Sequence, residues 1–301
     1  MKKRLIFFIT IFFTMFVLIG CSSSDTTEDA GGEEVTLDIF NIKVETSKQL
    51  EDLAEKYENE NPNVSVNVTT VGGGQDASSA LQAKFSSGEE PAIFMLSGLS
   101  GVEKYQNTLL DLSDLEAAKT ASEGTLEGVT VDGIPYGVPT SVEGFGWMIN
   151  KEIFKQAGID PENINTFDDF VNAVQVLEDN KEELGLEAVF AFTGKEFWVI
   201  SQFSSHFSSP EFNNSLNDAY NSESINYEYG DRMKEYVDLI IEHSIQPVLS
   251  LDYSTGVEEL FMNEKVAMVH QGNWIVPTLD SIDPEFSKEK LGILPFFVES
   301  D

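Results

Sequence analysis

The sequence predicts an α/β protein whose chain is divided between two lobes. The first observation is an alternation of strand, helix, strand, helix and strand patterns between residues 35 and 96, which is typical of a parallel sheet with helices on its faces. The second is length, because 301 residues exceed the size at which a single hydrophobic core usually divides. The third is that no internal repeat or coiled-coil heptad is evident, which favours an ordinary globular fold.

The first five elements follow from the period of their apolar residues. Residues 35–40 (VTLDIF) alternate apolar and polar side chains as a strand does, and residues 46–60 space their apolar side chains as a helix does. The next three expected elements are a strand over 64–71, a helix over 77–85 and a continuous apolar strand over 91–96. Ligands gather at the carboxyl ends of parallel strands, which here are residues 41–45 and 72–76.

The remainder of the chain predicts a hairpin and then further mixed elements. VTVDGIPYGVP (129–139) is expected to turn at Asp132-Gly133, a dipeptide typical of tight hairpins. Thr166 is expected to cap a helix over 166–185, whose first turn is acidic. The other expected elements are a strand over 144–149, a helix over 150–158 ending at Gly158, a strand over 186–192, helices over 196–203 and 231–243, a helix, a strand and a helix-opening loop over 254–279, and a last strand over 291–297.

The first twenty residues have the features of a secretory signal. Met1–Arg4 carries three positive charges, and the apolar run after it is too short for a comfortable membrane span. Leu18-Ile19-Gly20-Cys21 matches the bacterial lipobox, in which the cysteine is acylated, for example with palmitate, and becomes the new N-terminus. The alternative is that Cys21 is an ordinary small core residue. We expect a lipoprotein signal peptide over 1–20, then an acylated cysteine and flexible tether over 21–34, and hence a protein on the extracellular face of the cell membrane.

Charge and cysteine content restrict the partners. The formal net charge is −34, so nucleic acid and anionic lipid, which need clustered positive charge, are poor partners. The single cysteine leaves no disulfide within the chain. The expected membrane contact is therefore through the lipid anchor only.

Two of the three tryptophans lie close in sequence to polar residues, at predicted strand-to-helix junctions. Trp198 follows Glu196, and Trp274 follows Gln271 and Asn273. A flat ring stacks on the C–H face of a sugar, and amides and carboxylates pair with its hydroxyls, so this mixture favours a polyol site. The alternative for each ring is burial in the core, where most aromatic side chains lie.

The glycine run GGGQD (72–76) precedes a predicted helix. It lacks the GxGxxG spacing and the GK[ST] ending of phosphate-binding loops, so a nucleotide site has little support. A turn that brings the backbone close to a ligand, with Gln75 or Asp76 capping the next helix, is the better interpretation. The two interpretations are not exclusive.

Catalytic and metal-binding motifs are missing from the sequence. No HExxH, GxSxG or Cys–His arrangement occurs, and His206, His243 and His270 are scattered. Carboxylates are so abundant that a pair at glycosidase spacing arises by chance. We expect no catalytic residue, no cofactor and no metal.

Several runs of residues together resemble one family. In chain order they are IFNIKVE, ENENPNVSV, GGGQD, VTVDGIPYGVPTSVEGFGWMINKEIFKQAGI and DYSTGVEELFMNEKVAMVHQGNWIVPTLDSIDPE. With the lipobox, their order and spacing resemble the family 1 extracellular solute-binding proteins of ABC importers. They are most similar to the sugar-binding lipoproteins of the raffinose, stachyose and melibiose type, over essentially the whole mature chain.

The resemblance implies a periplasmic-binding-protein-like fold of type II, in which two lobes close over a ligand about a hinge. Lobe one would comprise residues 35–142 plus 267–301, and lobe two residues 143–266. The first hinge would be Thr140–Gly144, and the second would lie near Glu264–Val266.

The same resemblance implies twelve ligand-binding residues, whose carboxylates and amides would hold hydroxyls and whose tryptophans would stack on sugar rings. They are Asn41, Lys43, Glu45, Gln75, Asp76, Glu143, Glu196, Trp198, Asp252, Gln271, Asn273 and Trp274. The alternative for each is that it caps a helix or is solvated. The implied partners are an α-galactoside-like oligosaccharide and the permease subunits of an ABC importer, to which a monomeric binding protein without enzymatic activity would deliver its ligand.

The family continues beyond the strand that corresponds to LGILPFF, whereas this sequence stops at Asp301. We therefore expect a C-terminally incomplete fold, and we expect residues 22–301 alone to be unstable or to aggregate. The alternative functions are a tethered sensor or adhesin with the same fold, a truncated non-functional product, and a secreted glycosidase. The alternative ligands are a peptide, a glycerophosphodiester and a polyamine.

Overall fold

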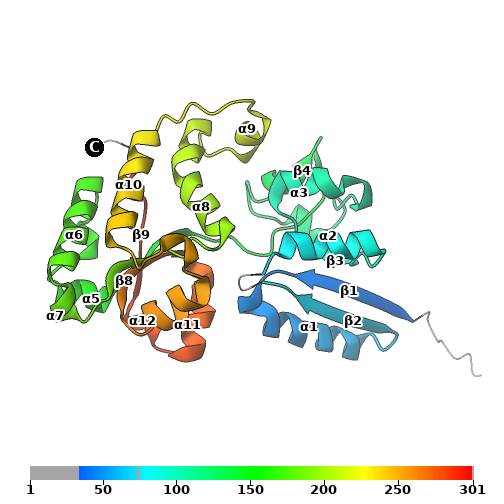
Figure 1. Cartoon of the computed structure of the whole chain (residues 1–301). Helices are drawn as coiled ribbons and strands as arrows, with labels where there is room; N and C mark the ends of the chain where they lie inside the picture. Colours follow the sequence, from blue (N-terminus) through cyan, green and yellow to red (C-terminus); the bar gives the residue numbers. More distant parts are fainter. Residues whose placement is uncertain (1–33, 73–74, 300–301) are drawn as a thin grey trace, which may run out of the picture.

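The computed structural model describes residues 34–72 and 75–299 and shows two bodies side by side (Figure 1). The body that contains the N-terminal strands, here called lobe one, is built on a three-stranded sheet with a separate two-stranded hairpin. The other body, lobe two, is built on a four-stranded sheet. The predicted α/β architecture with two lobes is therefore confirmed. The expected signal peptide, Cys21 and nearly all of the tether lie outside the described residues.

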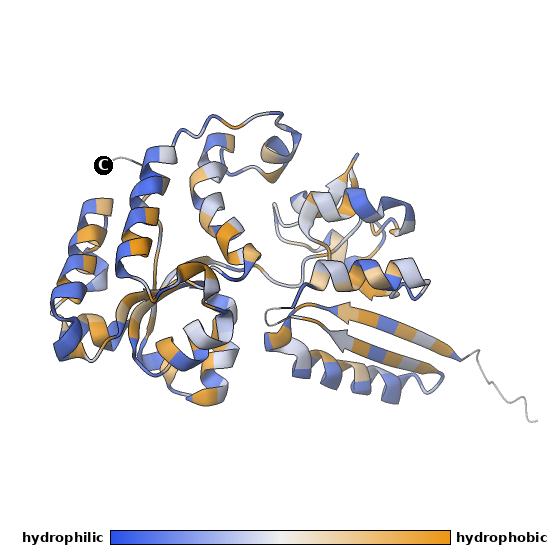
Figure 2. Ribbon diagram, in the orientation of Figure 1, coloured by the Kyte–Doolittle hydropathy of each residue, from blue (hydrophilic) through white to orange (hydrophobic). Residues whose placement is uncertain are grey.

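Lobe one is a parallel sheet of strand order β2-β1-β3. β1 (Val35–Asn41) pairs with β2 (Val64–Thr70) along its whole length, and its last residues pair with β3 (Ile93–Phe94). Hydrophobic and hydrophilic residues alternate along much of β1 and β2 (Figure 2), as the sequence pattern requires. Because the strands are parallel, the carboxyl ends of β1 and β2 finish at one edge of the sheet. The helices of lobe one are α1 (Ser47–Glu60), α2 (Ala77–Ser87), α3 (Gly98–Tyr105) and α4 (Glu116–Lys119).

The predicted hairpin of lobe one is confirmed. β4 (Thr130–Val131) and β5 (Ile134–Pro135) pair antiparallel around Asp132 and Gly133. These two residues have φ angles of 52° and 81°, the left-handed conformations of the tight turn that a two-residue hairpin loop favours.

Lobe two is a mixed sheet of strand order β7-β8-β6-β9 with helices around it. β6 runs antiparallel to both β8 and β9, whereas β7 runs parallel to β8. Its strands are β6 (Phe145–Asn150), β7 (Ala188–Ala191), β8 (Val266–Gly272) and β9 (Leu291–Leu294). Its helices are α5 (Lys151–Gln156), α6 (Phe167–Asp179), α7 (Lys181–Leu184), α8 (Phe197–Ser208), α9 (Leu216–Asn221), α10 (Gly230–His243), α11 (Val276–Ile282) and α12 (Phe286–Glu289).

The residues that form the sheet of lobe two differ from those that we expected in this lobe. Residues 267–301 were expected in lobe one, but β8 and β9, which cover much of that range, are hydrogen-bonded to β6 of lobe two. The physical reason is burial: all seven residues of β8 are buried, because the strand lies in the middle of the sheet between β7 and β6. The described part of this segment therefore belongs to lobe two.

Local sequence signals explain where several elements of lobe two begin and end. Thr166 caps α6 as predicted: its hydroxyl accepts from the backbone N–H of Asp169, whose carboxylate accepts from the N–H of Thr166. The single helix predicted over 166–185 is divided into α6 and α7 at Asn180. The helix expected at Ser254 is a π-helix over Ser254–Phe261, a rare form that often occurs near functional sites.

The core of lobe two is rich in aromatic rings. Trp147 of β6 is fully buried and stacks on Phe170 and Phe296, with ring centroids 6.0 and 5.4 Å apart. Buried rings of this size contribute strongly to stability through the apolar area that they remove from water. The core fixes the positions of β8 and α8, whose ends face lobe one.

Candidate functional site

A cavity of about 320 Å³ lies between the two lobes. Lobe one contributes residues after β1 and β2, the crossing segment between the lobes contributes one residue, and lobe two contributes residues from α8, from the start of the π-helix and from the segment after β8. The volume is at the lower end of the range for small-molecule sites. The lining residues are Ile42, Lys43, Val44, Glu45, Val71, Gly72, Gln75, Ala77, Glu143, Trp198, Gln202, Tyr253 and Trp274.

Two tryptophan rings form the lobe-two wall of the cavity. Trp198 lies in the first turn of α8, and Trp274 lies in the short 3-10 turn after β8. Their rings meet edge to face, with centroids 5.9 Å apart and an interplanar angle of 72°. Trp198 is 38% exposed, so an apolar ring face is accessible in the protein without ligand. Such an arrangement offers two ring faces at a steep angle to each other, which suits a ligand with more than one apolar face.

The orientation of Trp274 is fixed by hydrogen bonds on the side of the ring away from the cavity. Its Nε1 donates to Oε1 of Gln271 at 2.9 Å, and Nε2 of Gln271 donates to Oγ1 of Thr193 at 3.1 Å. Gly272 allows the ring to lie against the backbone, since a Cβ there would stand 2.3 Å from the Trp274 ring. These contacts within the protein hold the Trp274 ring in its orientation before any ligand binds.

Lys43 connects lobe one to the crossing segment and reaches the Trp274 ring. Its Nζ lies 2.7 and 2.6 Å from the two carboxylate oxygens of Glu143 and 3.4 Å from Oε1 of Glu45. The same ammonium is 5.8 Å from the centroid of Trp274. Because the side chains of Lys43 and Glu143 are about a quarter exposed, this ion pair contributes little to stability. Its geometry nevertheless places charged hydrogen-bonding groups beside a stacking surface.

Six of the twelve predicted site residues line the cavity, and six lie outside its lining. The six that the fold brings together are Lys43, Glu45, Gln75, Glu143, Trp198 and Trp274. The six outside the lining are Asn41, Asp76, Glu196, Asp252, Gln271 and Asn273, and each of them makes contacts with the protein.

Asn41 and Asp76 shape the two strand ends of lobe one. Asn41 is buried, and its amide donates to the carbonyl of Lys43 at 2.9 Å and to Oγ1 of Thr70 at 3.1 Å. Asp76 caps α2, as the sequence allowed, by accepting from the backbone N–H of Ser79 at 3.0 Å. The Ser79 hydroxyl and amide together lower the pKa of Asp76. Both residues set the course of the backbone that carries the lining side chains.

Glu196 bonds to the backbone of the cavity-lining Tyr253, and Asp252 bonds to the turn that follows it. Oε1 of Glu196 accepts from the backbone N–H of Tyr253 at 3.0 Å, and burial raises the pKa of Glu196. Asp252 accepts from the N–H of Thr255 at 3.0 Å and from Nζ of Lys195 at 3.0 Å. The Thr255 amide and then Lys195 lower the pKa of Asp252 to about 2, so it remains a carboxylate.

Gln271 and Asn273 also act behind the lining. Gln271 is fully buried and orients Trp274, as described above. Asn273 joins the end of β8 to the crossing segment: its N–H donates to the carbonyl of Gly144 at 3.0 Å, and its Oδ1 accepts from the N–H of Gly144 at 3.3 Å.

Sequence reasoning missed two polar or aromatic residues of the lining, Gln202 and Tyr253. Gln202 lies four residues after Trp198 and therefore on the same face of α8, a helical spacing that could have revealed it. Tyr253 lies between Asp252 and the π-helix, where no periodic pattern distinguishes it from a core aromatic. The apolar lining residues Ile42, Val44 and Val71 carry no chemical signal in the sequence.

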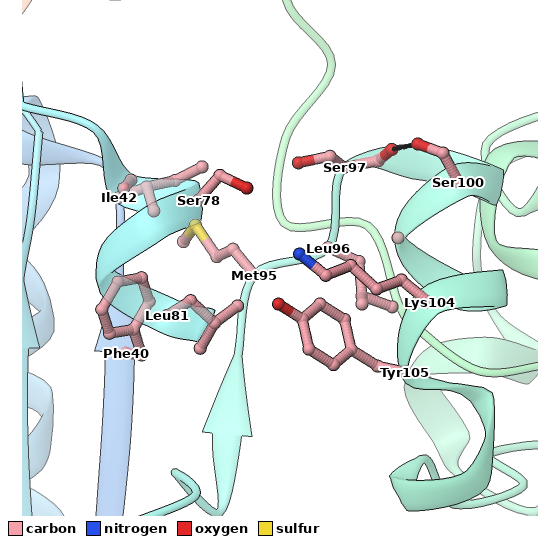
Figure 3. A pocket seen from close by; sticks show the side chains of 12 residues that line it. Phe40, Ile42, Ser78, Leu81, Met95, Leu96, Ser97, Ser100, Lys104 and Tyr105 are labelled. Carbon is pink, nitrogen blue, oxygen red and sulfur yellow. Dashed lines mark hydrogen bonds between the residues drawn. The ribbon is translucent and has the colours of Figure 1, made fainter. Parts of the chain in front are cut away.

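A second cavity, of about 210 Å³, lies within lobe one between α2 and α3 (Figure 3). Its inner side chains are mostly apolar, and Ser97 and Ser100 on its rim are joined by the hydrogen bond from the Ser100 hydroxyl to the Ser97 carbonyl. Lys104 at its edge lies 5.2 Å from the Tyr105 ring centroid. Its polar lining residues are Ser78, Ser97, Ser100, Lys104 and Tyr105, with no carboxylate, side-chain amide or tryptophan, and it lies within one lobe, so this cavity is a weaker candidate than the one between the lobes.

The lobes also touch at a rim formed by α9 of lobe two. Oε1 of Glu127, in lobe one, accepts from the hydroxyl of Ser215 and from the backbone N–H of Asn217, both at 3.1 Å. The hydroxyl of Tyr220 donates to the carboxylate of Glu103 in α3. These bonds join the lobes at a place separate from the crossing segment.

Glu127→Ala is expected to shift the lobes toward a more open arrangement by about three- to tenfold, because it removes two hydrogen bonds between them. Small-angle scattering of the ligand-free protein should then give a larger radius of gyration. Glu123→Ala, an exposed acidic residue of the same lobe, is the matched control. Identical radii for wild type and Glu127→Ala would contradict the prediction.

Among residues 34–72 and 75–299, no helix combines the length and apolarity that a bilayer crossing requires. Over those same ranges, no group of three or more His, Cys, Asp and Glu side chains is placed to hold a metal ion.

The known proteins to which the chain is similar are binding proteins. The chain is 24% identical over 291 residues to the multiple sugar-binding protein of Streptococcus mutans, covering 91% of this chain and 65% of that protein. It is 26% identical over 248 residues to an ABC transporter extracellular-binding protein of Pyrococcus horikoshii, covering 79% of this chain and 55% of that protein. The chain thus spans less than two thirds of the length of these curated relatives.

Solved structures share the fold. The solute-binding protein RafE in complex with raffinose has a TM-score of 0.69 and 22% identity, over 88% of this chain and 69% of that one. A chitin oligosaccharide binding protein has a TM-score of 0.71 and 23% identity, over 90% of this chain and 69% of that one. The family model for bacterial extracellular solute-binding proteins matches residues 43–301, which is most of the sequence. The chain therefore belongs to the bacterial extracellular solute-binding protein family.

Proposed function

We propose that this chain is the extracellular binding component of an ABC importer and that it captures an α-galactoside-like oligosaccharide between its lobes. The observation that carries the proposal is the pairing of two tryptophan rings with amide, carboxylate and ammonium groups around one cavity. Ring faces stack on the C–H faces of sugars, and these polar groups donate to and accept from hydroxyls. The names of the relatives, a multiple sugar-binding protein and a raffinose complex, support the same ligand class.

The charges of the cavity favour a neutral ligand over a polyamine or a phosphodiester. Lys43 is neutralised by Glu143 within 2.7 Å and by Glu45 nearby, so the described lining has no unpaired cation for a phosphate. The same pairing leaves the two carboxylates only partly available to a polyamine. Hydroxyl groups, in contrast, pair with ionised and neutral side chains alike.

The two-lobe arrangement supplies a mechanism for capture. A ligand that contacts Lys43 and Glu45 of lobe one together with Trp198 and Trp274 of lobe two gains most interactions when the lobes are closed. Binding energy therefore shifts the population toward the closed form, by no more than the difference in affinity between the two forms. We propose that the closed, monomeric form is what the permease subunits recognise.

Attachment to the membrane through Cys21 is part of the same proposal. The support is the lipobox at residues 18–21 and the basic and apolar segment before it. Metabolic labelling with an alkyne palmitate should label the wild-type protein and leave Cys21→Ser unlabelled and released into the medium. Equal labelling of the two proteins would contradict the anchor.

The ligand is tested by isothermal titration calorimetry of one preparation against raffinose, stachyose, melibiose and maltose, with spermidine, a glycerophosphodiester and a tripeptide as competitors from other classes. Micromolar or tighter binding of an α-galactoside, with no heat from the non-sugars, is the expected result. Tighter binding of spermidine or the phosphodiester than of every sugar would overturn the ligand class.

A further inference from the structure

Three polar or aromatic side chains of α8 share one helix face. Trp198, Gln202 and His206 are spaced four residues apart, which places each one turn beyond the last. Trp198 and Gln202 line the interlobe cavity, whereas Nε2 of His206 lies 3.3 Å from Nε2 of His270 in the core. Gln202 therefore stands where the cavity meets the core of lobe two.

The amide of Gln202 is incompletely paired. Its Oε1 is buried and has no hydrogen-bond partner among the residues that the structure describes. Of the described residues that line the cavity, Gln202 is the only one with such a buried, unpartnered side-chain atom. By comparison, Lys43, Glu143 and the Nε1 group of Trp274 all have partners within the protein.

Packing does not explain a glutamine at this position. A buried amide oxygen without a donor destabilises the folded protein, because the group has lost water and gained nothing in return. The lining that Gln202 shares includes Ile42, Val44 and Val71, so an apolar side chain would suit this cavity wall at least as well. Local conflicts of this kind are expected at functional positions.

We propose that Gln202 is a specificity-determining residue and that its amide pairs with a hydroxyl of a neutral sugar ring held against Trp198 and Trp274. The proposal rests on the sugar-binding function proposed above. A glutamine amide carries both an acceptor and two donors, and its terminal torsion is broad, so it can meet a hydroxyl in either sense. A sugar that lacks this hydroxyl leaves the amide buried and unpaired, and such sites reject the deoxy analogue strongly.

The test combines Gln202→Met with raffinose and with the set of raffinose analogues that each lack one hydroxyl of the galactosyl ring. Methionine keeps the length of the side chain and removes both hydrogen-bonding groups. We expect the variant to bind raffinose about ten- to a hundredfold more weakly while its melting temperature is unchanged or higher. One deoxy analogue should bind the wild-type protein about as weakly as raffinose binds Gln202→Met. The same analogue should bind Gln202→Met little more weakly than raffinose does, because both changes remove the same hydrogen bond. Ser201→Ala, on the exposed face of α8, is the control variant.

The possible outcomes separate this inference from the proposed function. Wild-type affinity in Gln202→Met, or a deoxy series whose losses are the same in variant and wild type, overturns the inference while leaving sugar binding in place. A lowered melting temperature together with weaker binding assigns Gln202 a structural role and also overturns it. Absence of binding of every sugar by the wild-type protein overturns both proposals.

Discussion

Under the function proposed above, Trp274→Ala should weaken raffinose binding at least a hundredfold, which corresponds to about 3 kcal/mol. The ring is the part of the cavity wall that is held most firmly, since its Nε1 is bonded to the buried Gln271 and its face lies near Lys43. Truncation removes the stacking surface and leaves the Gln271 amide without its donor. Titration calorimetry of the variant and the wild type measures the loss directly.

Two companion variants distinguish stacking from general damage. Trp274→Phe keeps a ring but removes the indole N–H, so we expect an intermediate loss. Gly272→Ala keeps the indole but puts a methyl group within 2.3 Å of the ring and 2.5 Å of the Gly144 carbonyl oxygen, so it should displace both the ring and the crossing segment and reproduce much of the loss. Tyr57→Ala removes an exposed aromatic residue of α1, outside the cavity lining, and is the control. Raffinose affinity in Trp274→Ala within threefold of wild type would show that the ring is not a ligand contact.

The sequence predicted the fold where the signal is local. Period-two and helical patterns gave β1, α1 and β2 nearly at their observed bounds, and Asp132-Gly133 gave the hairpin turn. The placement of residues 267–301, which was implied by the resemblance, was wrong for β8 and β9. The largely apolar pattern of β8 indicates that the strand is buried but does not indicate which sheet buries it. Neighbours in a sheet are decided by long-range packing, which no local pattern encodes.

The sequence predicted only part of the candidate site, and the rest was missed for a related reason. Strand ends identified the segments that reach the cavity, but β1 ends at Asn41, and beyond that residue the period of the strand no longer predicts which way a side chain points. Lys43 faces the cavity while Asn41, two residues earlier, is buried against Thr70 and the backbone. Gln202 was missed because a single amide within an aromatic helix has no motif of its own, and its unpaired oxygen is visible only in three dimensions.

Two neutral histidines lie beneath the cavity among aromatic rings. The His206 ring stacks on Phe296 with centroids 4.0 Å apart, and His270 packs against Phe192 and Phe203. Their Nε2 atoms are 3.3 Å apart, so one ring must donate to the other and both cannot be protonated without repulsion. Burial lowers the pKa of His206 to about 4, and burial together with the neighbouring His206 lowers the pKa of His270 to about 3.

The free energy of unfolding should therefore fall by about 4 kcal/mol between pH 7 and pH 5. Both pKa values are lower in the folded protein than the ordinary value near 6.5, so the unfolded chain binds protons first as the pH falls. The stability that these histidines contribute is present above about pH 6.5 and is lost as the pH falls toward their folded pKa values. The loss is about 1.4 kcal/mol per pH unit for each histidine, a large part of the stability of an ordinary domain.

Denaturant unfolding at a series of pH values measures this loss. His206→Phe retains a ring against Phe296 and removes one titrating group, so it should reduce the slope below pH 6.5 by about half. Ring-proton signals of the two histidines should stay at their neutral positions down to about pH 5 in the folded protein and titrate near 6.5 in denaturant. Carboxylates with lowered pKa values, such as Asp252, titrate below this window, so they do not produce the slope. Histidines that titrate near 6.5 in the folded protein would sink the prediction.

Ligand binding should change at a lower pH than stability, where the folded protein itself takes up a proton at His206. His206 and Gln202 share one face of α8 with Trp198, so protonation that loosens the packing of His206 acts on the helix that forms one wall of the cavity. Because the pKa of His206 is about 4 in the folded protein, raffinose affinity should hold between pH 6.5 and pH 5, fall as the pH drops from 5 toward 4 in the wild type, and fall less in His206→Phe. Because raffinose itself does not titrate in this range, any such dependence must come from the protein, and its reduction in His206→Phe would assign it to the histidine pair.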